Sequence, residues 1–406
     1  MKNILYLLII SLLISCRSEP QTEPEPQPSE GRTVLMYIIA DNNLESFAID
    51  DINEMEAAWA GSMGPKDNIL VFLNRSHGRN QLYKIVEDNN IYNMSSPVIK
   101  DYPEEMDPTD PAVLRAVIDD VQRMYPSKSY GLGMWSHGSG WVPSGDVPLE
   151  SPQPEQKKIS RLDFAEPSMP EPKEGTSYVI GITNRFRRSM EIDQMAKVLS
   201  GLHFDFIFFD ACYMGSVELA YELRHVCDYL VSSVAEIVVK GAPYDLVAAD
   251  MVRLPTREAV VTLATKYYNH CQAQSGNDQS STISVVESSK LETVAQELKK
   301  IVTPNPRVPI NSIQQFGRSD YVGIYHDLDD FVKQTWGTMA TAQFSAALNQ
   351  AVIYKAATAK MFQFLDIKTH CGLSAYIPRS YQRITLNAFI TRYGWSKASG
   401  LDKMIE

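Results

Sequence analysis

The chain has 406 residues, of which 44% are hydrophobic and 21% are charged, and its formal net charge is −11. This composition is that of an ordinary globular protein, and the acidic balance argues against the basic surface of a nucleic-acid-binding protein. We therefore expect no nucleic-acid partner. The length allows two or three domains, or one large α/β domain with an appendage.

The N-terminus has the pattern of a signal peptide. Residues 1–15, "MKNILYLLIISLLIS", place one lysine before an apolar run that is too short for a stable membrane span. The run ends in "LISC", which resembles the cleavage box of bacterial lipoproteins, in which the cysteine (here Cys16) carries the lipid. An ordinary secretory signal with an incidental cysteine is the alternative.

Residues 16–31 are rich in Pro, Glu, Gln and Ser, and they predict an extended tether because they cannot bury a core. A lipid anchor and a tether would hold the folded part outside the cytoplasm, next to a bacterial membrane. We therefore expect a periplasmic or cell-surface protein that contacts the membrane through its N-terminal lipid.

Apolar runs of strand length alternate with helical patterns from residue 32 to about residue 254. Strands are expected at 32–40, 68–75, 130–141, 204–211 and 229–237, with a hairpin around Asn89–Asn90 and regular structure again from 177. Helices are expected at 41–61, 110–126, 191–202 and 213–226. The fold class predicted is α/β, with a mostly parallel sheet covered by helices on both faces.

Two of these helices carry start signals. Asp41 or Asn43 can cap the first, and Asp110 followed by Pro111 can cap the helix at 110–126. We assign residues 32–255 to this sheet domain.

The rest of the chain has mainly helical patterns. Helices are expected at 256–273, 287–303, 326–335 and 340–362, followed by one strand at 371–378. We interpret 256–406 as a smaller, mainly helical domain that packs on the sheet.

One segment of the first half has a different composition. Residues 142–175 contain seven prolines and several basic residues, which predict a long loop. Such a loop inside a compact domain is usually functional or disordered.

Two chemically reactive residues follow predicted parallel strands. His137 lies in "MWSHGSGW" and Cys212 in "FFDACYMG", and ligands bind at the carboxyl edge of such sheets. An imidazolium stabilises a thiolate nucleophile, and a helix beginning at residue 213 would add positive potential. The N–H groups of Gly138 and Cys212 are candidate oxyanion donors. The pattern indicates a Cys–His hydrolase, although a cysteine or a histidine at such a position is often only structural.

The other cysteines suggest no further chemistry. Cys227, Cys271 and Cys371 have no close spacing, so they form neither a disulfide scaffold nor a zinc ribbon.

The two central motifs, "SHGSGW" and "FDACYMGSVELAYEL", resemble the clostripain family of cysteine peptidases. The stretches "ADNNLE", "DLDDF" and "GLSAYIP" agree, so the resemblance covers about residues 32–378. It implies a caspase-like fold, as in the wider group of caspases, gingipains and legumains. It further implies that Cys212 is the nucleophile, that His137 donates a proton to the leaving amine, and that Gly138 and Cys212 form the oxyanion hole.

The resemblance also implies a substrate preference. In this family the aspartate two residues before the cysteine, here Asp210, lines an S1 pocket that selects Arg or Lys at P1. A carboxylate suits a guanidinium or ammonium group. The alternative is a strand-end aspartate that accepts backbone N–H groups. Glu236 or Asp245 could add a second charge.

Several members of the family cut themselves in the region of the 142–175 loop, after a basic residue. The candidate cleavage sites here are Lys157, Lys158, Arg161 and Lys173. An uncut loop could cover the active site and make the chain a zymogen. A disordered insertion without a function is the alternative.

We therefore expect an extracytoplasmic cysteine endopeptidase that cleaves protein or peptide substrates after a basic P1 residue. We expect the protein to be a monomer. A catalytically inactive relative that binds surface ligands is the first alternative. A hydrolase that uses Ser136 or Ser139 is the second, although no G-x-S-x-G motif supports it.

No cofactor is expected, and a requirement for calcium is left open. Asp50, Asp51 and Glu54 form an acidic cluster without the spacing of a calcium loop, and a solvated helix face explains them better. Asn74 stands where the family commonly has an aspartate.

Overall fold

The structure is a computed structural model that describes residues 29–59, 66–76, 78–90, 92–142, 181, 183–186, 188–317 and 324–405. The expected signal peptide, the lipidation site Cys16 and most of the tether lie outside these ranges. So do the candidate cleavage sites Lys157, Lys158, Arg161 and Lys173. Within the described ranges, no helix combines the length and apolar character needed to cross a membrane.

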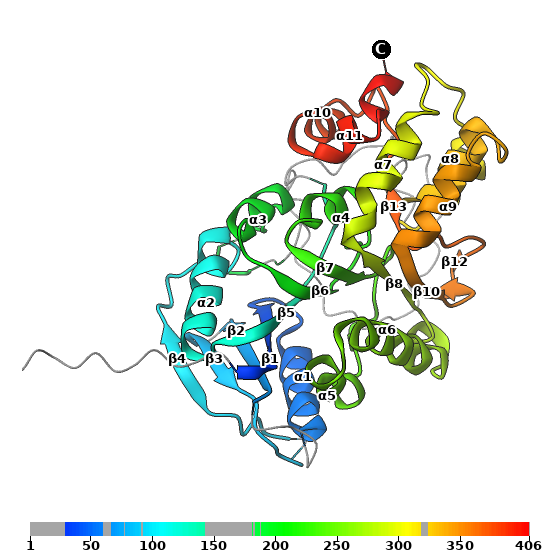
Figure 1. Ribbon diagram of the computed structural model, residues 1–406. Helices are drawn as coiled ribbons and strands as arrows, with labels where there is room; N and C mark the ends of the chain where they lie inside the picture. The colour runs from blue at the N-terminus through cyan, green and yellow to red at the C-terminus, as the bar shows by residue number, and fades with distance from the viewer. Residues whose placement is uncertain are drawn as a thin grey trace, which may run out of the picture.

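A nine-stranded sheet forms the centre of the fold (Figure 1). Its strands are β1 (Ser29–Ala40), β2 (Asn68–Arg75), β3 (Asn80–Lys84), β4 (Val98–Tyr102), β5 (Ser127–Trp135), β6 (Phe204–Asp210), β7 (Cys227–Ser232), β8 (Thr282–Glu287) and β10 (Val352–Ala357). The order is β10-β8-β7-β6-β5-β1-β2-β3-β4. The strands from β7 to β2 are parallel, and the outer strands on both sides pair antiparallel.

Two short antiparallel pairs lie outside this sheet. They are β9 (His326–Asp327) with β13 (Ser374–Ala375), and β11 (Lys360–Met361) with β12 (Leu365–Asp366). Short 3-10 turns occur at η1 (Gly276–Asp278), η2 (Ser288–Lys290), η3 (Ile310–Ser312) and η5 (Leu401–Met404).

Helices cover both faces of the sheet, as Figure 1 shows. One face packs against α1 (Glu45–Ala58), α5 (Tyr244–Arg253) and α6 (Thr256–Gln272). The core on the other face includes residues of α2 (Pro111–Met124), α3 (Ile192–Leu199), α4 (Val217–Leu223), α7 (Leu291–Lys299), α8 (Leu328–Trp336), α9 (Ala342–Ala351), α10 (Arg383–Arg392) and α11 (Gly394–Ala398). The α/β fold class expected from the sequence is confirmed.

The central strand β6 shows why these strands are apolar throughout. Phe206 and Phe208 point into the core beneath α5 and α6, whereas Ile207 and Phe209 point into the core on the opposite face. Side chains alternate along a strand, so a strand covered on both faces is apolar at every position. All four of these side chains are at most 1% exposed.

The second half of the chain contributes strands to the same sheet. β8 lies in a region where only helices were expected, and the helix expected at 340–362 ends at Ala351, after which β10 follows. That helix prediction is wrong in its second half because Val352, Ile353 and Tyr354 favour an extended edge strand that pairs with β8. The strand expected at 371–378 is limited to β13.

Several boundaries in the first half also differ from the expectation. The expected hairpin is present as the antiparallel pair β3–β4, but residues 85–97 connect its strands instead of a tight turn at Asn89–Asn90. Asp110 caps α2 as predicted, since its side chain accepts the N–H of Ala112. The start of α1 at Glu45 has no side-chain cap, so the capping role expected for Asp41 or Asn43 is wrong.

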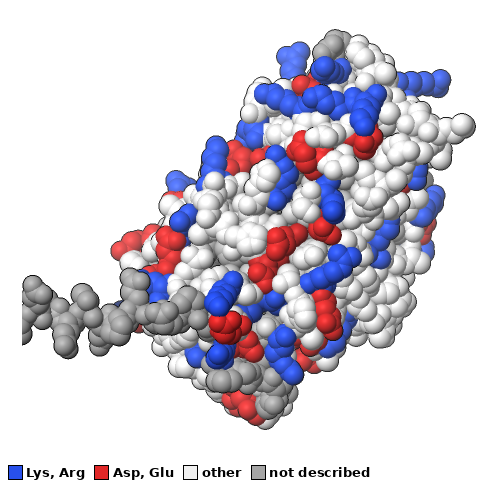
Figure 2. All heavy atoms as spheres, viewed as in Figure 1, with Lys and Arg blue, Asp and Glu red and all other residues white. Residues whose placement is uncertain are grey.

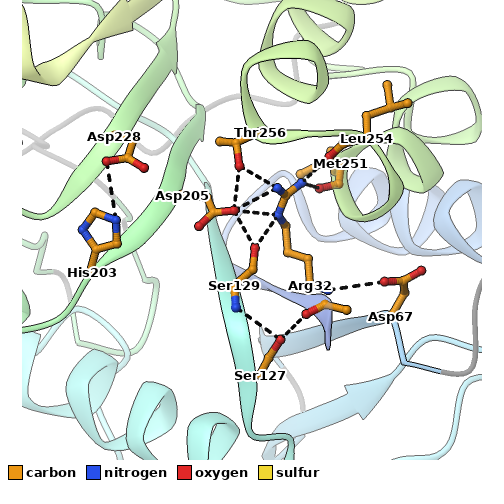
Figure 3. A network of polar contacts seen from close by, with 11 residues as sticks. Arg32, Asp67, Ser127, Ser129, His203, Asp205, Asp228, Met251, Leu254 and Thr256 are labelled. Atoms are coloured by element: carbon orange, nitrogen blue, oxygen red, sulfur yellow. Dashed lines mark hydrogen bonds and ion pairs between the residues drawn. The ribbon is translucent and has the colours of Figure 1, made fainter. Parts of the chain in front are cut away.

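A buried arginine holds the amino edge of the sheet (Figure 3). Arg32 on β1 is 7% exposed, and its guanidinium contacts the Asp205 carboxylate of β6, with Nη2–Oδ2 at 2.8 Å. It also donates to the carbonyls of Met251 and Leu254 and to the hydroxyl of Thr256. This cluster fastens the corner between α5 and α6 to the sheet.

Acidic and basic side chains are interspersed over much of the face shown in Figure 2. Surface ion pairs of the protein include Lys128 with Glu30 and Arg115 with Asp119. Isolated exposed pairs of this kind contribute little to stability. The right-hand side of the view, near α9 and β10, carries fewer charged side chains.

Candidate active site

The register of two neighbouring strands brings the predicted reactive residues together. β5 and β6 are parallel, and Trp135 at the end of β5 pairs with Asp210 at the end of β6. His137 and Cys212 each lie two residues beyond this pair. Both therefore emerge at the carboxyl edge of adjacent strands, where open α/β sheets bind ligands.

Gly138 lies directly against the backbone of Cys212. A Cβ atom added to Gly138 would lie 2.6 Å from the Cys212 carbonyl oxygen and 3.2 Å from its nitrogen. Any side chain would collide there, so glycine is required for this close approach. The contact joins the two backbone segments expected to supply the oxyanion donors.

His137 is held in a defined orientation. Its Nε2 lies 2.7 Å from Oδ1 of Asn43, and its carbonyl accepts the N–H of Gly181 at 2.9 Å. An amide oxygen can only accept, so Nε2 carries the proton and Nδ1 remains the basic nitrogen. Burial lowers the pKa of His137 to about 4, so the imidazole is neutral at neutral pH in this buried setting.

Asn43 was not predicted as a site residue, although it lies in the "ADNNLE" motif. We expect Asn43→Ala to lower kcat about 10- to 100-fold with a smaller change in KM, because a misplaced imidazole transfers protons poorly. Asn43→Asp keeps the acceptor and should restore part of kcat. Its carboxylate should also move the pH profile upward by raising the pKa of His137.

The pH profile separates this positioning role from a purely structural one. A variant that had only lost folded protein would show lower activity at every pH and an unchanged profile. An unaltered kcat in Asn43→Ala would contradict the assignment.

Cys212 is the half-buried cysteine among the four free cysteines in the described part of the chain. Its Sγ accepts the backbone N–H of Ile237 at 3.3 Å, a contact that favours the thiolate. The other three are buried, and burial raises the pKa of Cys227 and of Cys271 to about 12. Only Cys212 combines access with a donor on its sulfur.

One expected contribution to thiolate stability is absent from the structure. The helix predicted from residue 213 begins at Val217, where Ser216 caps α4. The field of a helix terminus falls off within about one turn, so α4 lies too far along the chain to act on Cys212. Residues 211–215 form a turn because their backbone hydrogen bonds go to the segment after β7.

The residue after Cys212 is fixed in a strained conformation. Tyr213 has a positive φ of 61°, and its ring stacks on Tyr325 at a centroid distance of 4.3 Å. Its hydroxyl donates to Oε1 of Glu236 at 2.8 Å, while the Tyr325 hydroxyl donates to the carbonyl of Ser139 at 2.6 Å. Positive φ is rare for a non-glycine residue and is found mainly where surrounding contacts enforce it. These contacts tie the turns that carry Cys212 and His137 to each other.

Asp210 ends β6 on the face that packs against α5 and α6. It is 2% exposed, and its Oδ2 accepts the N–H of Ala242 at 3.0 Å and the hydroxyl of Tyr244 at 2.9 Å. Its Oδ1 is buried without a hydrogen-bond partner in the described part of the chain. Burial raises the pKa of Asp210 to about 6, against the effect of its two donors.

Asp210 and Cys212 are two residues apart, and on a continuous strand both side chains would lie on the same face. β6 ends at Asp210, however, so this alternation does not extend to Cys212. Cys212 packs against the core on the opposite face. Asp51 of α1 is a second buried carboxyl near Asp210. Burial raises the pKa of Asp51 most, and repulsion from the Asp210 carboxylate raises it further. Asp51 accepts the indole N–H of Trp135 at 2.7 Å. The buried environment of Asp210 beside Asp51 was not predicted from the sequence.

The structure separates the two candidates for a second S1 charge. Glu236 lies beside Cys212, since it precedes Ile237 and contacts Tyr213. Asp245 is exposed and lies near Glu54 of α1. The position of Glu236 therefore fits an S1 role, whereas that of Asp245 does not bring it to Cys212.

The serine candidates have other surroundings. Ser136 donates its hydroxyl to the carbonyl of Ile39 at 2.8 Å, and it is 4% exposed. The Ser139 hydroxyl is buried without a hydrogen-bond partner in the described ranges. Neither serine has the base contact that activates a hydroxyl nucleophile.

The acidic residues of α1 accept hydrogen bonds from other parts of the fold. Glu54 accepts the N–H of Tyr244 at 2.9 Å, and Asp51 accepts from Trp135. Asp51 is 2% exposed, so the solvated face expected for this cluster is wrong at that position. Within the described ranges, no group of three or more His, Cys, Asp or Glu residues could hold a metal ion. Asn74 bonds to Asn80 and to the N–H of Asp41.

The remaining motifs have structural roles. Asp327 of "DLDDF" caps α8 and accepts the N–H of Cys371. Glu218 of α4 is fully buried and accepts the N–H of Tyr376 in "GLSAYIP" at 2.8 Å. Burial raises its pKa to about 8, so it is mainly protonated at neutral pH. These contacts join the C-terminal region to the helix after the cysteine turn.

A thiol and an imidazole on adjacent parallel strand ends, with a backbone N–H on the sulfur, define a cysteine-dependent hydrolase of the α/β class. The chain belongs to the clostripain family, a family of cysteine peptidases, because the model of that family matches residues 36–154 and 181–397. The resemblance found in the sequence is thus confirmed.

Individual relatives agree with this assignment. Clostripain from Hathewaya histolytica is 26% identical over an alignment of 288 residues, which covers 63% of this chain and 49% of that protein. The chain thus spans about half the length of this curated relative. An inactive zymogen of a C11 protease from Parabacteroides distasonis is 27% identical with a TM-score of 0.73, covering 92% of this chain and 99% of that one.

A further solved structure is that of a secreted C11 cysteine protease from Bacteroides thetaiotaomicron in complex with an irreversible peptide inhibitor. It is 26% identical with a TM-score of 0.73, covering 93% of this chain and 100% of that one. The similarity to both solved structures therefore extends over nearly the whole chain.

Proposed function

We propose that the protein is an extracytoplasmic cysteine endopeptidase that cleaves peptide bonds after Arg or Lys. The observation that carries the proposal is the contact between Gly138 and the Cys212 backbone, with His137 beside it at the same sheet edge. In this mechanism Nδ1 of His137 takes the Cys212 proton, and the thiolate attacks the scissile carbonyl. The imidazolium then protonates the leaving amine, and water hydrolyses the thioester.

The N–H groups of Gly138 and Cys212 would stabilise the oxyanion that develops during attack. The match to the clostripain family and the inhibitor-bound relative support a peptide substrate. A catalytically inactive binding protein is the alternative, but it leaves the donor on the Cys212 sulfur and the oriented imidazole without a purpose.

The preference for a basic P1 residue rests on Asp210. Its Oδ1 is a buried acceptor with no hydrogen-bond partner in the described part of the chain. A cationic substrate side chain would supply this missing donor. Gly241 lies against this carboxylate, since a Cβ there would be 2.6 Å from Oδ2. Binding of a basic side chain would therefore require the segment around Gly241 to shift.

Asp210→Asn tests this assignment. We expect kcat/KM for Arg and Lys reporter peptides to fall about 100-fold or more, because a buried charge pair is lost. Alkylation of Cys212 should continue at a similar rate. Since the pKa of Asp210 is raised to about 6, the carboxylate is protonated as the pH falls through that value, and wild-type kcat/KM for basic reporters should decline there.

The matched control is Asp228→Asn, which alters an exposed carboxylate that pairs with His203. It should keep the preference for basic reporters. An unchanged preference in Asp210→Asn would show that the S1 charge lies elsewhere.

The finer features of the proposal concern residues outside the described ranges. They are a lipid on Cys16 and self-cleavage after Lys157, Lys158, Arg161 or Lys173. The secreted relative from Bacteroides thetaiotaomicron supports an extracytoplasmic location. The zymogen form of the Parabacteroides distasonis relative supports activation by cleavage. We propose that the protein acts as a monomer and that the lipid anchors it to a bacterial membrane.

A further inference from the structure

A buried tyrosine from the second half of the chain contacts both turns of the candidate active site. Tyr325 lies just before β9 and is 0% exposed. Its hydroxyl donates to the carbonyl of Ser139 at 2.6 Å, and its ring stacks on Tyr213 at a centroid distance of 4.3 Å. Ser139 directly follows Gly138 in the chain, and Tyr213 directly follows Cys212. The Tyr325 side chain therefore contacts the residue after each of the two proposed oxyanion donors.

The sheet itself does not fix the distance between these two donors. Within the described residues, the pairing of β5 with β6 ends at Trp135 and Asp210. Gly138 and Cys212 lie three and two residues beyond this pair. Oxyanion donors must be held at a fixed spacing before the reaction, because their effect depends on preorganisation. Contacts outside the strand ladder must therefore hold the two turns in place.

The packing between the turns leaves little room for movement. Gly140 has a positive φ of 68°, and a Cβ there would lie 2.8 Å from the carbonyl oxygen of Tyr213 and 3.3 Å from Cε1 of Tyr325. The N–H of Tyr213, whose φ is 61°, donates to the carbonyl of Ala235 at 2.9 Å. A non-glycine residue keeps such a conformation only where its surroundings enforce it. The stacked Tyr325 ring is one of the contacts that do so.

Tyr325 is in turn held by the C-terminal region. Its carbonyl accepts the N–H of Phe316 at 2.8 Å. The next residue, His326, begins β9, which pairs with β13. β13 contacts the turn after the cysteine as well, since the N–H of Ser374 donates to the carbonyl of Gly215 at 2.9 Å. The β9–β13 pair thus anchors Tyr325 against the two turns.

We propose that Tyr325 is a positioning residue of the oxyanion hole, which fixes the spacing of the Gly138 and Cys212 N–H groups without touching the substrate. The proposal rests on the proposed roles of Cys212, His137 and Gly138. It adds to the site a residue from the second half of the chain. Because the oxyanion exists only during the reaction, loss of this positioning should affect the transition state more than substrate binding or the reactivity of the thiol.

Tyr325→Phe tests the hydroxyl contact, since it keeps the stacked ring. We expect kcat for Arg and Lys reporter peptides to fall about tenfold, with KM changed by less than about twofold. A peptide aldehyde should also bind about tenfold more weakly. The Cys212 sulfur adds to its carbonyl carbon, and the former carbonyl oxygen becomes the hemithioacetal oxygen that the two donors would hold. Alkylation of Cys212 by iodoacetamide forms no oxyanion, so its rate should change by less than about twofold.

Tyr37→Phe is the matched control. Tyr37 is also 0% exposed, its ring stacks on Phe72 at 4.5 Å, and its hydroxyl donates to the carbonyl of Pro108 at 2.9 Å. The same chemical change is thus made within β1 instead of between the two turns. Both variants should lower the urea midpoint by a similar amount. Only Tyr325→Phe should lower kcat and aldehyde affinity, and an equal loss in both variants would assign Tyr325 a purely structural role.

Tyr325→Leu removes the stacking as well as the hydroxyl. Its effect on kcat and on aldehyde affinity should be larger, about 100-fold, because the Tyr213 conformation would lose one of its supports. The inhibition constant of the aldehyde does not depend on the fraction of enzyme that is folded. Partial unfolding of the variant therefore cannot produce this loss of affinity. Unchanged aldehyde affinity in both Tyr325 variants would overturn the proposal.

Cys212→Ala, measured with the same reporter peptides, separates this proposal from the proposed function. Hydrolysis that survives in Cys212→Ala would contradict the proposed function. Hydrolysis that requires Cys212 but is unaffected by Tyr325→Phe and by Tyr325→Leu would contradict the positioning role alone.

Discussion

Replacing Cys212 by alanine should lower kcat/KM for peptide substrates at least about 1,000-fold, because the thiol proposed to form the covalent intermediate is lost. His137→Ala should have an effect of similar size, since the thiol would lose its base and the leaving amine its proton donor. The two losses should not add in the double variant, because the residues act as one unit. The measurement is hydrolysis of Arg and Lys reporter peptides.

Two controls show whether the loss is chemical. His203→Ala removes an exposed imidazole at the opposite end of β6, where it pairs with Asp228, and should leave hydrolysis unchanged. Thermal unfolding of Cys212→Ala should match wild type, because Cys212 is only half-buried. Turnover that survives in Cys212→Ala would exclude the thiol as nucleophile.

The same variant tests self-processing. If wild type cuts itself in the 142–175 loop, the Cys212→Ala chain should remain intact when it is produced and incubated under the same conditions. Nicks at the same positions in the variant would assign the cleavage to another peptidase. Mass spectrometry of the fragments would then identify the site used in wild type.

The central sheet could be predicted because its strands are apolar on both faces. β6 is the clearest case, since Phe206 and Phe208 serve one core while Ile207 and Phe209 serve the other. β8 and β10 were missed because short apolar runs near helical patterns do not distinguish a strand from a helix. These runs form strands because β8 pairs with β7 and β10 pairs with β8. Such pairing joins segments that lie far apart in the sequence, so local patterns do not reveal it.

The candidate site was predictable only in part, for the same reason. His137 and Cys212 could be recognised because each follows a buried strand and lies in a glycine-containing turn. Asn43 could not, because 94 positions separate it from His137 and its type and place favoured a helix cap. The Ile237 contact to the Cys212 sulfur comes from a backbone N–H, and side-chain identity carries no signal for it.

Replacing Arg32 by methionine should destabilise the fold by about 3–5 kcal/mol, because removal of one partner leaves a largely buried charge unpaired. The Asp205 carboxylate is 18% exposed, and among the described residues it would keep the hydroxyls of Ser129 and Thr256 as its donors. The carbonyls of Met251 and Leu254 would also lose their donor. Urea unfolding at equilibrium measures the change in free energy, and a lower midpoint with an unchanged slope is expected.

Arg257→Met is the matched control, since Arg257 is 61% exposed and pairs with Glu287 at 3.4 Å. It should change the free energy of unfolding by less than about 1 kcal/mol. Arg32→Lys should fall between the two, because an ammonium group cannot reproduce the forked contacts of the guanidinium. If Arg32→Met changes the free energy of unfolding as little as the control does, the Arg32 cluster does not stabilise the junction of α5 and α6 with the sheet.

The position of this cluster decides what else the variant should show. Arg32 lies at the start of β1, whereas Asn43, which orients His137, follows the end of the same strand. Destabilisation at the amino edge should therefore lower the folded fraction without changing the chemistry of the folded molecules. In Arg32→Met we expect kcat per folded molecule, titrated through Cys212 labelling, to equal that of wild type. A lower kcat per labelled site would mean that β1 transmits disorder from one edge of the sheet to the other.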